Sequence, residues 1–234
     1  MCGYVQRALE TAELERLLEK IGLEELTGDL FSHSPDQVEH FYPAFGGNPN
    51  RKIRNLIIQH EGKPRLVDAT WWFDCTAVGD ELRVGKRTSF NARNLDSPFW
   101  KGALRHHRGL VAATGIGESK VIDGKKHQFL MIGNEPFLLG ALYRPFSNGH
   151  FSCAVITRDA HLKMEPYHDK AFPLFIPATK DFVQLWLDDT VMQSEVIDEL
   201  LAHPKLTATL QVEEVKTFKR GSVSALATVL EADE

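Results

Sequence analysis

Hydrophobic positions near the N-terminus recur at intervals of three and four residues. This spacing places apolar side chains on one face of a helix, and it predicts a helix over residues 11–21 that ends at Gly22. The stretches 179–187 and 191–203 have the same character, and Pro204 closes the second one. The apolar positions of the first helix are Leu14, Leu17, Leu18 and Ile21.

Other apolar positions alternate with polar ones or form short runs, both of which are typical of strands. Leu206, Ala208, Leu210 and Val212 alternate most regularly. The residues Gly133–Pro136 predict a turn between two of the runs. The expected strands are 55–59, 128–132, 137–143, 151–157, 172–176, 206–212 and 222–230.

The order of these elements indicates the class of fold. Strands and helices do not alternate in βαβ units, so we expect an α+β fold with a mainly antiparallel β-sheet or barrel core and peripheral helices. Short helices are expected after the capping signal Ser34–Gln37 and over 157–166, a loop over 43–50, and an extended, loop-rich stretch over 74–99. No repeat or linker divides the chain, so we expect a single domain over residues 1–234.

Charge restricts the possible partners. The formal net charge of −5 argues against indiscriminate nucleic-acid binding, which depends on neutralising phosphates. Basic residues nevertheless concentrate in the middle of the chain and favour one positive surface there, although such a run can also be an ordinary solvated face. The basic residues expected to contribute to this surface include Arg83, Arg87, Arg93 and Arg105.

The cysteines favour a reducing compartment. Cys2, Cys75 and Cys153 are odd in number and widely spaced, so neither a disulfide framework nor a structural zinc site is expected. Cys153 lies in an apolar run and is expected to be buried. We expect no metal and no cofactor, because His106, His107 and His127 lack a supporting carboxylate or cysteine. With no apolar run of transmembrane length and no signal sequence, we expect a cytoplasmic protein that does not enter membranes.

Cys2 is the most informative single residue. Aminopeptidases remove an initiator methionine when the next side chain is small, and cysteine is small enough. The mature chain would then begin with an α-amine of pKa about 8 beside a thiol of pKa about 8.5. Such a 1,2-aminothiol can condense with an aldehyde and close a thiazolidine ring, or the thiol can attack an acyl carbon. The alternative is an ordinary start followed by an inert cysteine.

Four other segments carry groups that suit this chemistry. Asn91 and Arg93 lie two apart and would share one face of an extended segment. Glu118 is a lone carboxylate in a glycine-punctuated apolar strand, where burial raises the pKa. His168 lies at a turn before an apolar run, and the Trp71–Trp72 pair could stack on exposed bases. Each has a structural alternative: a surface turn, a salt-bridge partner, a capping histidine and core tryptophans.

Taken in order, these segments resemble one protein family. Cys2-Gly3, Asn91-Ala92-Arg93, Gly117-Glu118 and His168-Asp169, followed by Phe172-Pro173-Leu174, are similar to the motifs of the SOS-response-associated peptidase (SRAP) family. That family includes proteins that crosslink themselves to abasic sites in single-stranded DNA. The resemblance extends over nearly the whole chain, because the stretches 156–160, 183–187 and 200–201 also match.

The resemblance implies a role for each residue. Cys2 would be the nucleophile that forms a thiazolidine with the ring-opened deoxyribose, and Asn91 would position its amine or thiol. Glu118 would move protons during ring opening and Schiff-base formation, and His168 would assist at the sugar hydroxyl and in reversal. Arg93 would hold a phosphate. The other expected DNA contacts are Arg83, Arg87, Arg105, Trp71, Trp72 and Lys170.

The chain departs from the family motifs mainly where DNA would be contacted. Tyr4 stands where the family has arginine, and the tryptophans that usually flank the glutamate are missing around Glu118. Lys170 follows His168-Asp169 in place of arginine, and one residue is inserted before Phe172-Pro173. The residues expected to carry the covalent chemistry are all present.

Two other functions remain open from the sequence. An initial Met-Cys-Gly also resembles glutamine amidotransferases with an N-terminal cysteine, although their downstream motifs are missing here. A non-catalytic module could instead bind single-stranded DNA through the basic middle of the chain. The favoured partner is single-stranded DNA containing abasic sites, bound by a monomer that would associate with the nucleoid.

Overall fold

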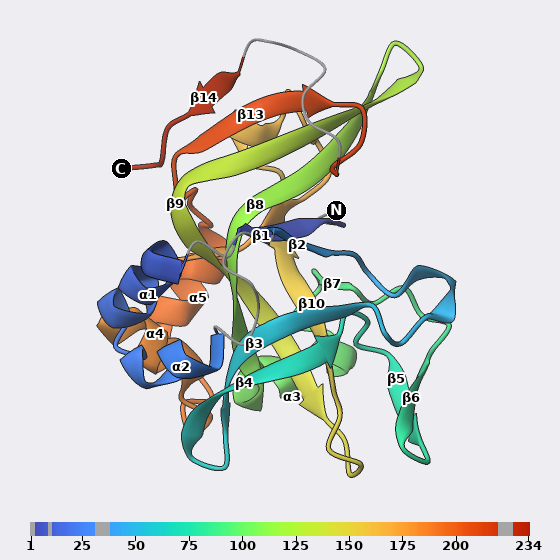
Figure 1. Ribbon diagram of the computed structural model, residues 1–234, viewed down its shortest axis with the longest axis vertical. Helices are drawn as coiled ribbons and strands as arrows, with labels where there is room; N and C mark the ends of the chain where they lie inside the picture. The colour runs from blue at the N-terminus through green and yellow to red at the C-terminus, as the bar shows by residue number, and fades with distance from the viewer. Residues whose placement is uncertain (1–2, 9–10, 31–37, 220–226) are drawn as a thin grey trace.

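The strands build a barrel with an extended edge (Figure 1). The computed structural model describes residues 3–8, 11–30, 38–219 and 227–234. The strands are β1 (Val5–Ala8), β2 (Val38–Phe41), β3 (Lys52–His60), β4 (Lys63–Thr70), β5 (Cys75–Val78), β6 (Glu81–Val84), β7 (Asn91–Ala92), β8 (Arg108–Ile122), β9 (Lys125–Pro145), β10 (Phe151–Arg158), β11 (Phe172–Pro173), β12 (Phe175–Ile176), β13 (Leu210–Val215) and β14 (Thr228–Leu230).

The helices lie outside the barrel. In Figure 1, α1, α4 and α5 gather on one side of the barrel and α3 crosses its lower end. The helices are α1 (Thr11–Lys20), α2 (Thr27–Leu30), α3 (Pro98–His106), α4 (Lys180–Leu187) and α5 (Glu195–Ala202), with 3₁₀ turns η1 (Glu24–Leu26), η2 (Phe45–Gly47) and η3 (Leu162–Met164).

Five strands close on themselves. Their order is β9-β10-β4-β3-β8, and β8 also pairs with β9, which completes the barrel. From this barrel the sheet extends through β1 and β2 at β8 and through β13 and β14 at β9. The pairings are antiparallel except for those of β10 with β4 and with β7. The predicted α+β fold with a mainly antiparallel barrel core and peripheral helices is therefore confirmed.

Alternation along the strands separates two cores. Val111 and Ala113 of β8 belong to a cluster inside the barrel, to which no described α-helix contributes. Leu110 and Ala112, which alternate with them in sequence, belong to a second cluster that also contains the apolar faces of α1, α3, α4 and α5. Alternate residues of the strand therefore face either the barrel interior or the helices, and the helices pack there with the apolar faces that their 3.6-residue period creates. Cys153 is fully buried in the first cluster, as predicted.

The predicted turn at Gly133–Pro136 is wrong. The chain continues as one strand, β9, from Lys125 to Pro145. The pairing with β8 shifts between Ala113, which lies opposite Phe137, and Gly115, which lies opposite Ile132. The turn-forming residues 133–136 therefore form a bulge within the strand. Gly133 is needed there, since a Cβ would lie 2.5 Å from the backbone oxygen of Glu135. The backbone N–H of Asn134 is bound by the carbonyl oxygen of Thr209, so tertiary pairing replaces the local turn.

Other sequence-based expectations agree in part. The helices predicted over 11–21, 179–187 and 191–203 correspond to α1, α4 and α5, whereas the helix expected over 157–166 is only the turn η3. The helix expected after Ser34 would begin outside the described ranges, and where the described residues resume Val38–Phe41 form strand β2, so that prediction is wrong over these residues. The first part of the strand expected over 222–230 also falls outside the described ranges. Helix α3 was not predicted, although Ser97 at its N-cap and Pro98 at its first position signal a helix start.

Candidate active site

A pocket of about 440 Å³ lies where the far half of β8 meets the loop that follows η3. Its volume is within the range usual for small-ligand sites. Glu118 and His168 line it together with Gly3, the first residue that the structure describes. Two of the four groups predicted from sequence to act in catalysis therefore meet at one cavity, and the described start of the chain reaches the same cavity.

Glu118 is a buried carboxyl on β8. Its exposed fraction is 2%, and it lies opposite the apolar Phe129 of β9. Burial is the main cause that raises its pKa to about 7, because an apolar environment disfavours the charged form. At neutral pH both protonation states of Glu118 are populated. The group can therefore donate or accept a proton without a large energetic cost.

His168 is held by the backbone on two sides. Its N–H donates to the carbonyl oxygen of Met164 in η3 at 2.8 Å. Its ring Nδ1 lies 2.9 Å from the carbonyl oxygen of Ser119 and 3.5 Å from Oε2 of Glu118. A carbonyl oxygen can only accept, so Nδ1 carries the proton. Burial is the main cause that lowers the pKa of His168, which favours the neutral ring with Nε2 as its basic nitrogen.

Asn91 faces the interior of the barrel from β7. It lies beside Val155 in the parallel pairing with β10, and Val155 belongs to the barrel core. Both polar atoms of the Asn91 amide are buried and have no hydrogen-bond partner among the described residues. The hydroxyl of Thr157, two residues beyond Val155, is in the same situation. Buried polar groups are seldom left unpaired, so both are candidates for contacting a bound group.

Thr157 was not among the site residues predicted from sequence. Its only signal was its place in the segment 156–160 that resembles a family motif. Cys2 lies outside the described residues. The nearest described part of the chain is fixed to β8, because the backbone N–H of Gly117 donates to the carbonyl oxygen of Tyr4 at 3.0 Å.

The two tryptophans predicted to stack on bases are core residues. Trp71 is fully buried and Trp72 is 6% exposed. The indole N–H of Trp71 donates to the carbonyl oxygen of Phe90, and that of Trp72 donates to the carbonyl oxygen of Gly85. Neither ring offers an exposed face to a base. The alternative that the sequence left open, a structural role, describes these tryptophans better.

The arginines predicted to bind DNA lie on several elements. Arg83 is exposed on the separate β5–β6 hairpin. The guanidinium of Arg87 lies 4.4 Å from the ring centroid of Phe99. Arg93 directly follows β7, and its Nη2 lies 2.9 Å from a carboxylate oxygen of Asp159. Each of the last two guanidinium groups thus already has a partner within the protein.

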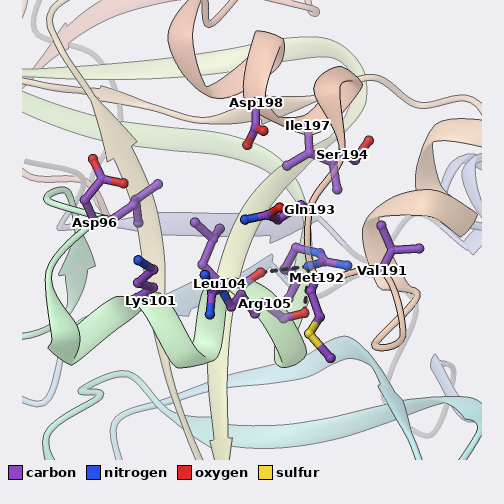
Figure 2. Close-up of a pocket in the computed structure, with 12 residues that line it drawn as sticks. Asp96, Lys101, Leu104, Arg105, Val191, Met192, Gln193, Ser194, Ile197 and Asp198 are labelled. Atoms are coloured by element: carbon purple, nitrogen blue, oxygen red, sulfur yellow. Dashed lines mark hydrogen bonds between the residues drawn. The ribbon is translucent and has the colours of Figure 1, made fainter.

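Arg105 lies in a different pocket from Glu118. Figure 2 shows Lys101 and Arg105 on α3 facing the segment 191–198 across a pocket of about 200 Å³. The buried Arg108 also lines this pocket and begins β8, ten residues before Glu118. Ten residues of strand span on the order of 30 Å. Arg105 and the Glu118 pocket therefore lie towards opposite ends of β8.

Three lysines line the Glu118 pocket. Lys170 was predicted as a DNA contact, whereas Lys120 and Lys126 were not. The ammonium group of Lys120 lies 2.5 Å from the carbonyl oxygen of Glu165 and 4.0 Å from a carboxylate oxygen of Asp169. The hairpin that joins β8 to β9 pairs Lys126 with Val121, the neighbour of Lys120, and both lysines line the same pocket. Sequence reasoning missed this because it did not pair the two strands.

Among the described residues, no group of three or more histidine, cysteine, aspartate or glutamate side chains is close enough to hold a metal ion. His127 instead contacts Glu214 at 2.7 Å. No helix in the described ranges is long and apolar enough to cross a membrane.

Comparisons with known proteins identify relatives of the chain. The family model for the SOS response associated peptidase (SRAP) matches residues 1–218. A solved protein of Bordetella bronchiseptica is 15% identical with a TM-score of 0.59, covering 92% of this chain and 100% of its own. A protein of Bacteroides thetaiotaomicron is 15% identical with a TM-score of 0.63, covering 94% and 95%. A phage-related protein of Bordetella bronchiseptica is 18% identical with a TM-score of 0.62, covering 92% and 95%. These structures share the fold, and no curated protein matches the chain.

Proposed function

Because this chain belongs to the SOS response associated peptidase family, we propose that it captures abasic sites in single-stranded DNA through a covalent bond to Cys2. The family membership supports a role related to DNA damage. The observation that carries the finer proposal is the pair of Glu118 and His168, 3.5 Å apart at a pocket that Gly3 also lines. Cys2 is bonded directly to Gly3, and consecutive Cα atoms are about 3.8 Å apart.

The proposed reaction begins with removal of Met1 by hydrolysis of its peptide bond, which frees the amine of Cys2. An abasic deoxyribose in its open form presents an aldehyde. The amine condenses with this aldehyde to an imine and releases one water molecule. The Cys2 sulfur then adds to the imine carbon, its proton passes to the nitrogen, and a five-membered thiazolidine joins protein and DNA. The thiol acts here as an activated nucleophile.

Glu118 would serve this sequence as a proton shuttle. Ring opening takes a proton from the anomeric hydroxyl and delivers one to the ring oxygen, and imine formation requires a proton on the departing hydroxyl. A carboxyl whose burial raises its pKa to about 7 can do both at neutral pH. His168, with Nδ1–H bound to the Ser119 carbonyl oxygen, would present the basic Nε2.

Asn91 would position the amine or the thiol of Cys2. The buried, unpaired polar atoms of Asn91 support this assignment, because an amide with no partner among the described residues gains a hydrogen bond by holding such a group. Thr157 joins the proposal for the same reason. Lys120, Lys126 and Lys170 would attract the phosphates on either side of the abasic nucleotide.

The test is a single-stranded oligonucleotide with one abasic site, incubated with the protein and run on a denaturing gel. We expect a heat-stable shifted band, and intact mass should show that Met1 is absent. Cys2→Ala should give no stable band, whereas Cys153→Ala, which removes a buried thiol of the barrel core, should crosslink at the wild-type rate.

Two outcomes would contradict the proposal. A band shift on a native gel with none on the denaturing gel would indicate a non-covalent DNA-binding module. Equal crosslinking by Cys2→Ala without added reductant would exclude the thiazolidine. With borohydride added, Cys2→Ala should form a trapped adduct, because its terminal amine can still make the imine.

A further inference from the structure

Tyr4 and Phe218 form a stacked pair at the edge of the Glu118 pocket. Their ring centroids are 4.6 Å apart and their planes differ by 17°. Tyr4 is fully buried, whereas Phe218, three residues after β13, lines the pocket. The Tyr4 hydroxyl also lies 2.6 Å from Nδ1 of His40 on β2 and 3.3 Å from the Phe218 carbonyl oxygen. Segments from both ends of the chain are therefore joined at Tyr4.

This pair packs directly on the backbone beside Glu118. A Cβ at Gly117 would lie 2.6 Å from the Phe218 ring and 2.7 Å from the Tyr4 ring, so only glycine leaves room for the stack. The antiparallel register places Val5 opposite Ile116, and the hydrogen bond from Gly117 to Tyr4 continues it by one residue. The same register extended by one more residue would bring Gly3 opposite Glu118, and both residues line the same pocket.

We propose that Phe218, acting through Tyr4, is a positioning residue that holds the N-terminal segment against Glu118 for the reaction of Cys2. This inference rests on the proposed function. The first residues of a chain are poorly ordered unless they are tied down, and Gly3 adds conformational freedom. Among the described residues, Tyr4 is the first with a side chain that can supply the tie, and Phe218 stacks on it.

A contact between Tyr4 and DNA is a poorer explanation of the same residues. Tyr4 has no exposed surface, and burial raises the pKa of its hydroxyl above the usual range, so the side chain is a neutral internal group. The family has arginine at the position of Tyr4. In this chain Tyr4 instead contributes to packing. Its stacking partner is Phe218, the last residue that the family model matches.

The experiment compares Phe218→Ala, Phe218→Tyr and Phe146→Ala. Phe146 is the matched control, a half-buried ring after β9 that contacts Arg144 and lines none of the Glu118 pocket. At saturating abasic DNA, Phe218→Ala should form the adduct roughly 10–100-fold more slowly, because small misplacements of reacting groups cost about that much. Its dissociation constant for intact single-stranded DNA should change by no more than a few-fold. Phe218→Tyr should restore the rate, and Phe146→Ala should keep it.

A second readout removes DNA from the experiment. Glycolaldehyde carries the reacting group without phosphates, and intact mass follows its thiazolidine with the N-terminal cysteine. Phe218→Ala should be slowed here by a similar factor. A wild-type rate with glycolaldehyde would overturn the inference, as would a loss confined to DNA and matched by weaker DNA binding. If Phe218→Ala fails to fold, Phe218→Leu retains apolar volume without the ring and decides by the same criteria.

The two proposals can fail separately. Wild-type protein that reacts with glycolaldehyde but never with abasic DNA would contradict the proposed function and leave the positioning role of Phe218 intact. Wild-type protein that crosslinks abasic DNA, with Phe218→Ala equally fast in both reactions, would contradict only the positioning role.

Discussion

Two charged side chains are buried on the same strand, β8, and they illustrate different uses of a buried charge. Arg108, at the start of the strand, is 4% exposed and Glu118, ten residues later, is 2% exposed. The guanidinium of Arg108 donates to the carbonyl oxygens of Leu104, Arg105, Trp186 and Asp188 at 2.5–3.0 Å. Glu118 instead borders a pocket and lies near a histidine.

The difference lies in what happens to each charge at neutral pH. Arginine remains protonated in proteins, and backbone oxygens that cannot move satisfy its donors, so Arg108 joins α3 and α4 to the barrel. Burial raises the pKa of Glu118 to about 7, so its charge changes close to neutral pH. A buried charge whose partners are fixed backbone groups stabilises a fold. A buried group that titrates beside a cavity can move protons.

The largest expected effect comes from Glu118→Gln. The variant keeps the shape of the side chain but cannot shuttle a proton, so adduct formation with abasic DNA should slow by roughly 10²–10⁴. Non-covalent DNA affinity should stay within a few-fold. The measurement is a time course on denaturing gels, with Glu213→Gln as control, since Glu213 is a half-buried carboxylate of β13 that lines none of the pocket. A wild-type rate for Glu118→Gln would show that the glutamate has a structural role and does not transfer protons in the reaction.

The next effect concerns stability at the other end of the strand. Arg108→Ala leaves several buried carbonyl oxygens without their donor, which should lower the free energy of unfolding by on the order of 3 kcal/mol. Urea unfolding measures this loss. The crosslinking rate of the folded variant should be unchanged at a temperature where it remains native. If the variant kept full stability but lost its reaction, the assignment of the two ends of β8 would be reversed.

A third prediction follows from the pKa of Glu118. Its carboxyl has a pKa of about 7 in the folded protein against the ordinary value of 4.5, so between these values the folded state binds more protons than the unfolded state. Stability therefore falls as pH rises through this window, by up to about 3 kcal/mol. Unfolding of wild type and Glu118→Gln from pH 4.5 to 8 should show the difference, and parallel curves would mean that Glu118 has an ordinary pKa.

Sequence patterns predicted what depends on local periodicity. The spacing of Leu14, Leu17 and Leu18 gave α1, and the alternation after Leu206 indicated the strand that pairs at Leu210. Gly133–Pro136 misled because the local signal for a turn is the same as that for a bulge, and only the pairing with β8 and the contact to Thr209 distinguish them. Long-range partners are not visible in a local window.

In the candidate site, too, the residue types were visible in the sequence, whereas their long-range contacts were not. Glu118 and His168 were identified by residue type and motif, and their contact required the fold to bring η3 next to β8. Trp71 and Trp72 were predicted as DNA contacts with a core role as the alternative, because aromatic residues suit both a stacking platform and a core, and burial decides between them. Phe218 had no signal in the sequence, since the role proposed for it depends on its stacking with Tyr4 at the other end of the chain.

The smallest expected effect tests which end of β8 meets the DNA backbone. Lys126 and Lys170 line the Glu118 pocket, whereas Arg105 lines the pocket beside α3. Each lost phosphate contact on single-stranded DNA should reduce the slope of log affinity against log salt by about 0.7. Lys126→Gln and Lys170→Gln should each do so and weaken binding a few-fold, while Arg105→Gln and the control Lys180→Gln should leave the slope unchanged. Fluorescence anisotropy over a range of salt concentrations measures all four. A reduced slope for Arg105→Gln would extend the DNA path to the α3 end of the strand, and equal slopes for all variants would mean that neither pocket holds the phosphates.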